Sequence, residues 1–146
     1  MHLSHEEEEY NLSLSKFESM LKTNKVFFFD SEEFEEIILH YLDMGKATLA
    51  KKALKLGLEQ HPKSTGLKLV QVEMLIYDDK LDQAEKLLNE LYAIEPTNEE
   101  IFIQKANIYS KRDQHEKAVE FLEQALTLTD DYADVYNLIG MEYLFM

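Results

Sequence analysis

The feature that most constrains this chain of 146 residues is an internal period of 34 residues. Pro62 and Pro96 are separated by one period, and a further step of 34 reaches Asp130, which opens the polar turn DDYADVY. Three more columns share the spacing: Ala50, Ala84 and Ala118; Leu54, Leu88 and Leu122; and Gly57, Leu91 and Ala125. Aligned columns at one fixed period are typical of repeat proteins, whose similar units stack along a line.

Each unit has the pattern of two helices. The whole sequence contains only 4 Gly and 2 Pro, the two residues that helix interiors tolerate least. In the first unit Phe34, Ile37 and Tyr41 recur at three- and four-residue steps, which places them on one face of a helix. Gly45 then separates this helix from the next. The sequence therefore predicts an all-α fold in which paired helices bury their remaining faces against the neighbouring pair.

The columns resemble the tetratricopeptide repeat family, whose first helix carries a large aromatic residue, Leu-Gly and Tyr, and whose second carries Ala, a large apolar residue and Pro. The third unit, EEIFIQKANIYSKRDQHEKAVEFLEQALTLTD, matches this pattern best. A fourth first helix is predicted from Tyr136, Ile139, Gly140 and Tyr143. The resemblance implies a right-handed alpha-alpha superhelix, a solenoid of antiparallel helix pairs. It also predicts that the sequence is cut from a longer repeat protein, because the second helix of the fourth unit is missing.

The period divides the chain into units 31–64, 65–98 and 99–132 and a partial unit 133–146. Two residues depart from the family pattern: Ile38 replaces the small residue in the first unit, and Lys68 stands where the large aromatic residue belongs in the second. Residues 1–12 are predicted to be an acidic disordered tail, and residues 13–30 a capping helix and linker. A sharper alternative is that residues 26–29, the run VFFF, occupy the protein's own groove as an internal ligand.

Composition disfavours several classes of function. A formal charge of -14, without a basic stripe, argues against nucleic acid as a partner. The sequence shows no phosphate-binding loop, nucleophile elbow or helical metal motif, so we expect no enzyme, no cofactor and no metal site. The start MHLSHEEEEY is unlike a signal peptide and no stretch is apolar enough for a membrane span, so a cytoplasmic protein without membrane contact is expected.

By resemblance, function belongs to a concave groove lined by the first helix of each unit. Projection of these helices gives the predicted partner-binding residues: Glu35, Leu39, Leu42, Leu69, Glu73, Ile76, Tyr77, Ile103, Asn107, Lys111, Asn137 and Met141. Such a row predicts a non-catalytic module that binds a peptide or helix segment of a partner protein. Ordinary packing is the alternative for Leu69 and Ile76, because the helix LKLVQVEMLIY is apolar enough to be buried on both sides.

The chemistry of this row suggests which partners fit. Some tetratricopeptide domains hold the C-terminal carboxylate of a chaperone through cations and asparagines on these helices. Here Asn107 is the only clear match, and Glu35, Leu69 and Ile103 stand where the cations would be. A basic or apolar peptide is therefore the expected partner.

A second class of function is self-association. Apolar residues of the last helix lack the second helix against which they would pack, and exposed apolar surface of this kind marks association. The predicted contact residues are Tyr136, Ile139, Tyr143, Leu144 and Phe145. This alternative predicts a structural or scaffold protein, with a possible homodimer formed through the C-terminal helix.

Overall fold

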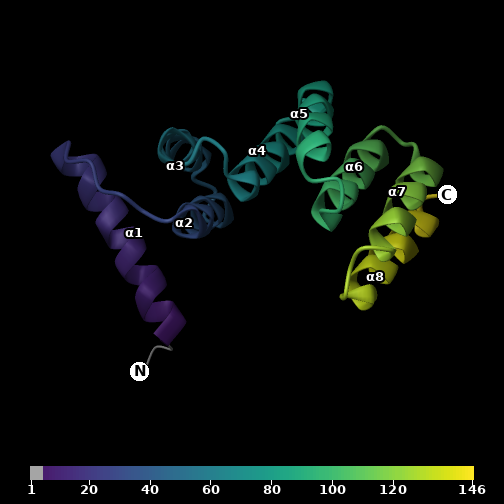
Figure 1. The fold of residues 1–146 in the computed structure, drawn as a ribbon, viewed down its shortest axis with the longest axis horizontal. Coiled ribbons are helices and arrows are strands. Elements are labelled where there is room, and N and C mark those ends of the chain that lie inside the picture. The colour runs from purple at the N-terminus through teal and green to yellow at the C-terminus, as the bar shows by residue number, and fades with distance from the viewer. Residues whose placement is uncertain (1–4) are drawn as a thin grey trace. The chain divides into compact units, whose positions relative to one another are not determined.

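The computed structural model describes residues 5–146, with side chains from residue 12 onward. This part of the chain is all-helical, which confirms the predicted fold class (Figure 1). In chain order the helices are α1 (His5–Thr23), α2 (Ser31–Asp43), α3 (Ala47–Gln60), α4 (Thr65–Tyr77), α5 (Leu81–Ile94), α6 (Glu99–Lys111), α7 (His115–Leu126) and α8 (Tyr132–Leu144). The chain forms two compact units, residues 1–68 and 69–146, which are described separately below.

The period of the sequence reappears in the helix starts and in the turns between them. α2, α4 and α6 begin at Ser31, Thr65 and Glu99, which are 34 residues apart. The turn after each of these helices contains one residue with positive φ, and these residues are also 34 apart: Gly45 (71°), Asp79 (61°) and Asp113 (59°). Each turn repeats one hydrogen-bond pattern, as in Lys46 N to Tyr41 O (2.8 Å) and Gly45 N to Leu42 O (3.0 Å). A left-handed residue that satisfies the last carbonyls of a helix is a common C-terminal cap.

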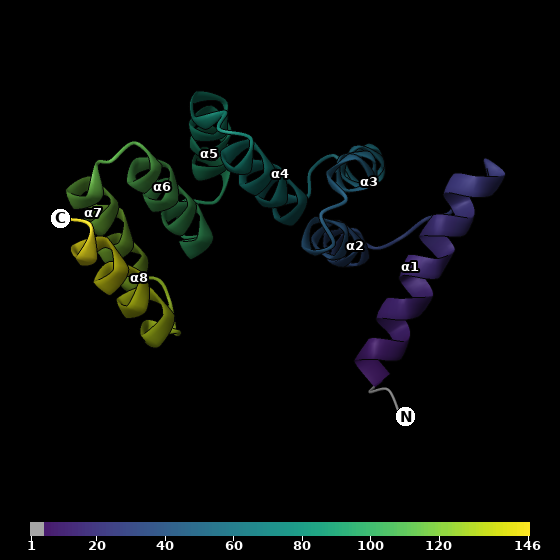
Figure 2. The same cartoon turned by 180° about the vertical axis from the view of Figure 1, so that it is seen from behind.

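In the first unit, α1 packs against α2. Phe17 of α1 is fully buried, with its ring 6.4 Å from that of Phe34 and 6.1 Å from those of Phe29 and Tyr41. The Ser13 hydroxyl of α1 donates to the Glu33 carboxylate of α2. Figure 2 shows the same helices from behind. The apolar face of α1 therefore covers the buried face of α2.

The start of α1 differs from the prediction. Residues 5–12 were predicted to be disordered, but the helix begins at His5. Glutamate has a high helix propensity, and carboxylates in the first turns are favoured by the positive end of the helix dipole. Acidic composition was therefore a poor sign of disorder here. The remainder of the predicted tail, residues 1–4, lies outside the described residues.

The linker after α1 is extended, and the end of α3 holds it. Gln60 uses both ends of its side-chain amide: its Nε2 donates to Phe27 O (2.8 Å), and its Oε1 accepts from Phe29 N (3.1 Å). His61 Nε2 donates to Phe29 O at 2.6 Å. Phe29 is buried against Phe17 and Phe34, whereas Phe28 is 77% exposed. This segment therefore follows the end of α3, and the alternative in which residues 26–29 fill a groove is wrong.

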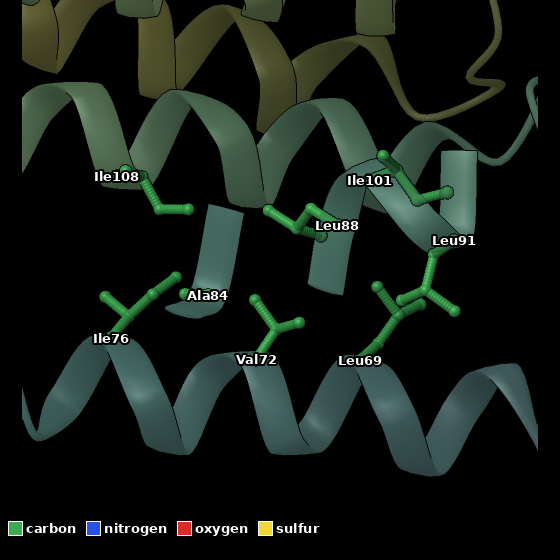
Figure 3. Close-up of a cluster of buried hydrophobic side chains, with 8 residues drawn as sticks. All are labelled: Leu69, Val72, Ile76, Ala84, Leu88, Leu91, Ile101 and Ile108. Atoms are coloured by element: carbon green, nitrogen blue, oxygen red, sulfur yellow. The ribbon is translucent and has the colours of Figure 1, made fainter. Parts of the chain in front are cut away.

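The second unit is built on two apolar clusters. The first joins α4, α5 and α6 and is drawn in Figure 3, where the side chains of α4 point toward those of α5 and α6. Its buried members are Leu69, Val72, Ile76, Ala84, Leu88, Leu91, Ile101 and Ile108. The second joins α6, α7 and α8 through Phe102, Ala106, Ala118, Leu122, Ala125 and Val135. α6 contributes to both clusters, so its remaining faces are the ones available for function.

Candidate functional site

The predicted groove residues of the first unit lie on α2. Leu39 is 43% exposed, and Leu42 is partly buried. Glu35 is partly buried, and its carboxylate lies close to Gly66 at the start of α4: a Cβ added at Gly66 would lie 2.5 Å from Glu35 Oε1, so the carboxylate would have to move. Burial raises the pKa of the Glu35 carboxyl, and the charges of Glu32 and Glu36 raise it further. An acidic and aliphatic surface is therefore present on α2.

In the second unit, two of the predicted groove residues are core residues instead. Leu69 is 9% exposed and Ile76 is 2% exposed, and both belong to the cluster formed with α5 and α6. The alternative of ordinary packing is therefore correct for these two positions. Their burial follows from the composition of α4, which presents apolar side chains in more than one direction, so projection of a single face could not identify its exposed side.

Most of the other predicted residues of the second unit are exposed, on α4, α6 and α8. Tyr77 is 81% exposed and Met141 is 50% exposed. Asn107, Lys111 and Asn137 are exposed, while Ile103 is partly buried against the second cluster. Glu73, Asn107 and Met141 occupy equivalent positions 34 residues apart on the three helices. We call these three the first-helix row.

A group of polar residues that the sequence did not single out lies beside Glu73. Gln104 Nε2 on α6 donates to Glu73 Oε1 on α4 (3.0 Å) and to Glu100 Oε1 one helical turn earlier on α6 (3.0 Å). Gln104 is only 5% exposed. We call Glu73, Glu99, Glu100 and Gln104 the acceptor cluster.

The surroundings of Glu100 in the acceptor cluster disfavour the charged form of its carboxyl group. Burial raises the pKa of the Glu100 carboxyl, the hydrogen bond from Gln104 opposes this, and the charge of Glu99 raises it further. Two buried oxygens of the cluster, Gln104 Oε1 and Glu99 Oε2, have no hydrogen-bond partner among the described residues. An unpaired buried acceptor costs about 1–3 kcal/mol, so each of these two oxygens lowers the stability of the fold when no donor reaches it.

One signal in the sequence could have revealed Gln104. The equivalent positions one period before and after it are Val70 and Leu138, both apolar. A polar residue in an otherwise apolar column needs a partner when it is buried, and Glu100, four residues earlier, lies on the same helix face. The contact with Glu73 could not be deduced in this way, because it depends on the packing of α4 against α6.

The residues predicted for self-association lie on α8, except Phe145, which directly follows the helix. Tyr136, Tyr143, Leu144 and Phe145 are between 57% and 83% exposed. Ile139 differs, because it is partly buried against the cluster that joins α6, α7 and α8. The C-terminal end of α8 is also tied to α7: the ring of Phe145 stacks on His115 at 5.3 Å, and His115 Nδ1 donates to Glu142 Oε2 at 2.7 Å.

Among residues 12–146, whose side chains the structure describes, no group of three His, Asp or Glu side chains is placed to hold a metal ion. None of the helices between residues 5 and 146 is long and apolar enough to cross a membrane. What this part of the chain offers is a set of surfaces: the first-helix row, the acceptor cluster and the apolar face of α8.

Comparison with known proteins identifies the class. The tetratricopeptide repeat family model matches residues 75–141, from the end of α4 into α8. This region therefore belongs to the tetratricopeptide repeat family, which confirms the resemblance of the sequence columns. Among curated protein sequences, none matches the chain.

Solved structures with the same fold are similar to this chain over a longer range than the family model matches. One is the crystal structure of YrrB, a TPR protein with an unusual peptide-binding site, with 19% sequence identity and a TM-score of 0.68. The match covers 90% of this chain and 66% of YrrB, so this chain spans slightly less than two thirds of its length. A mutant of MamA is similar over 94% of this chain and 74% of its own, with 18% identity and a TM-score of 0.61. At these identities the likeness concerns the fold.

Proposed function

We propose that the chain is a non-catalytic protein-interaction module that binds an extended peptide segment of a partner through the first-helix row. The observation that carries this proposal is the set of accessible side chains at equivalent positions on successive first helices, Glu73, Asn107 and Met141. The helices beneath them are fixed by the two apolar clusters. A repeated helix face of this kind can read a peptide at regular intervals.

The composition of the row supports the choice of ligand. Asn107 offers both a donor and an acceptor, as a peptide backbone does, and Met141 is a flexible apolar contact that adapts to different side chains. YrrB, which shares this fold, has a peptide-binding site, and that likeness also favours a peptide as the ligand. The protein's acidic surface favours partners with basic or apolar segments.

A display library of random 12-residue peptides, selected on the full chain, tests this function. Selected peptides should bind in solution, and the double variant Asn107→Ala, Met141→Ala should weaken their binding about tenfold or more, as expected for loss of central contacts. Lys86→Ala with Glu90→Ala, which alters exposed residues of α5, is the matched control and should leave binding unchanged. Failure to select any binding peptide, or equal binding by both variants, would contradict the proposal.

The exposed apolar face of α8 supports a second candidate function, association with another copy of the chain. Tyr136, Tyr143 and Leu144 are each more than half exposed. Large exposed apolar side chains gathered on one helix are typical of interaction surfaces.

Sedimentation velocity over a wide range of protein concentration tests the second candidate. Self-association through α8 predicts a shift to larger species with concentration, abolished by Tyr143→Ser with Leu144→Ser. Substitution of Tyr77, an exposed residue outside α8, by serine should leave the distribution unchanged. A monomer at every concentration would remove this candidate and would not affect the peptide-binding proposal.

A further inference from the structure

We infer that residues 25–30 form an open edge strand, which pairs in antiparallel fashion with the same segment of a second copy of the chain. The segment joins the end of α1 to the start of α2 (Figure 1). It belongs neither to the first-helix row nor to α8. The inference therefore goes beyond the proposed function and depends on neither of the surfaces named there.

The first argument is the exposure of the side chains along this segment. Val26 is 71% exposed and Phe28 is 77% exposed, whereas Phe27 is partly buried and Phe29 is buried. Alternation with a period of two is that of an extended chain. The run VFFF also consists of β-branched and aromatic residues, which strands favour. The segment thus has the side-chain pattern and the composition of a strand, although no strand of the described chain lies beside it.

The second argument is that one backbone edge of the segment is occupied and the other is open. The N–H and C=O groups of Phe27 and Phe29 are hydrogen-bonded to side chains of α1 and of the end of α3. Successive residues of an extended chain direct these groups to opposite sides, so those of Val26 and Phe28 point outward. Neither of these two residues has a backbone hydrogen bond within the described part of the chain. An unpaired edge of this kind is a template for another strand.

The third argument identifies the occupant from charge. The exposed residues Lys22 and Lys25 precede the uncharged run, and the exposed residues Asp30 and Glu32 follow it. An antiparallel pair of such segments places the basic end of each beside the acidic end of the other, whereas a parallel pair would bring like charges together. The segment is therefore complementary to a second copy of itself in the antiparallel direction.

The outward backbone groups also determine the register. Residues that exchange hydrogen bonds across an antiparallel pair must both point outward, which places Val26 of one copy opposite Phe28 of the other. Phe27 then lies opposite itself on a two-fold axis, as a symmetric dimer requires. Pairing of Phe28 with itself would instead set Val26 against the charged Asp30. In the inferred register each exposed apolar side chain gains an apolar neighbour, and aromatic pairs with β-branched residues are favourable.

Disulfide trapping tests both the pairing and the register, because the chain has no cysteine of its own. Residues opposite each other in a hydrogen-bonded antiparallel pair have Cα atoms about 5.5 Å apart, which suits a disulfide. Val26→Cys mixed with Phe28→Cys should therefore form cross-linked dimers under mild oxidation at least about tenfold faster than either variant alone. Equal rates in the three samples would overturn the inference.

A backbone variant tests the hydrogen bonds of the edge. Phe28→Pro removes the outward N–H group from each copy and should weaken dimerisation about tenfold or more. Phe28→Val is the matched control, because it shortens the side chain but keeps the N–H group and the preference for a strand. Helix content measured by circular dichroism should be the same in both variants, since this N–H group has no partner within the described residues.

Sedimentation equilibrium of the full chain measures the dimerisation of these variants. All of them also carry Tyr143→Ser and Leu144→Ser, so that association through α8 does not contribute. Equal dimerisation of the proline and valine variants, or a valine variant that is monomeric at every concentration, would overturn the edge pairing. Either result would leave the selection of peptides by the first-helix row unaffected.

Discussion

At the scale of single residues, the surface and the core of α4 are separated by one or two positions along the helix. Ile76 is 2% exposed, and its neighbour Tyr77 is 81% exposed. Leu69 and Ile76 are in the core because α6 packs against the side of α4 that carries them, through Ile101 and Ile108. Substitutions on the buried side of α4 should therefore lower stability, whereas substitutions on its exposed side should affect binding.

Leu69→Ala is expected to lower the free energy of unfolding by about 2–4 kcal/mol, because it removes buried methyl groups and leaves a cavity between α4 and α6. Tyr77→Ala on the same helix should change it by less than about 0.5 kcal/mol, as is usual for exposed positions. Urea denaturation followed by circular dichroism measures both. Equal losses for the two variants would show that the packing of α4 differs from that in Figure 3.

Glu100→Gln is expected to stabilise the protein at pH 7. Burial raises the pKa of Glu100 in the folded state, so the folded state binds the proton more tightly than the unfolded state does. Stability associated with this group is therefore present at low pH and is lost as pH rises through the folded-state pKa. Removal of the charge should raise the free energy of unfolding at pH 7 by roughly 0.5 kcal/mol, a small value because solvent screens the partly exposed carboxylate. The gain should vanish near pH 4, and a constant gain across thermal melts at both pH values would contradict this explanation.

At the scale of the elements, the same turn joins the two helices of each pair. Gly45, Asp79 and Asp113 adopt the same left-handed conformation although only the first is glycine. The backbone hydrogen bonds around them are equivalent, with Lys80 N to Leu75 O at 2.8 Å and Gln114 N to Tyr109 O at 2.9 Å. The turn geometry is thus set by the helix pair that it joins, and aspartate accepts a conformation that glycine adopts without strain.

Asp79→Gly is expected to raise the free energy of unfolding by about 0.5 kcal/mol, because it relieves the left-handed strain, partly offset by greater freedom of the unfolded chain. The reciprocal change, Gly45→Ala, should lower it by about 1 kcal/mol, although open space surrounds the added Cβ. Thermal melts of the two variants check the pair. A stabilising Gly45→Ala would show that helix propensity, and not the turn conformation, dominates at these positions.

At the scale of the whole molecule, charge is the dominant property. The formal charge of -14 arises from 29 acidic and 15 basic residues. Several of the cations are already engaged: Arg112 contacts Asp82 at 2.6 Å and Glu85 at 3.2 Å, and Lys105 lies over the rings of Tyr92 and Phe121. The net electric field of the protein is therefore negative.

Salt is expected to stabilise the folded protein. Raising sodium chloride from about 20 mM to about 500 mM shortens the screening length and weakens the self-repulsion of the compact state, so Tm should rise by several degrees. A variant with Glu59→Lys and Glu90→Lys, both on the surface, carries less net charge and should respond less. A Tm that falls with salt would mean that attractive pairs such as Arg112 with Asp82 outweigh the repulsion.

The sequence by itself determined the period, the all-α class and the identity of the repeated core positions. These follow from local rules, because apolar residues at helical spacing and small residues at equivalent positions must be buried wherever the helices lie. Tertiary structure alone decided which side of α4 faces α6 and that Gln104 joins Glu73 to Glu100. Both depend on a neighbouring element. Side chains far apart in sequence meet only when helices pack, so the acceptor cluster could be recognised only in the folded chain.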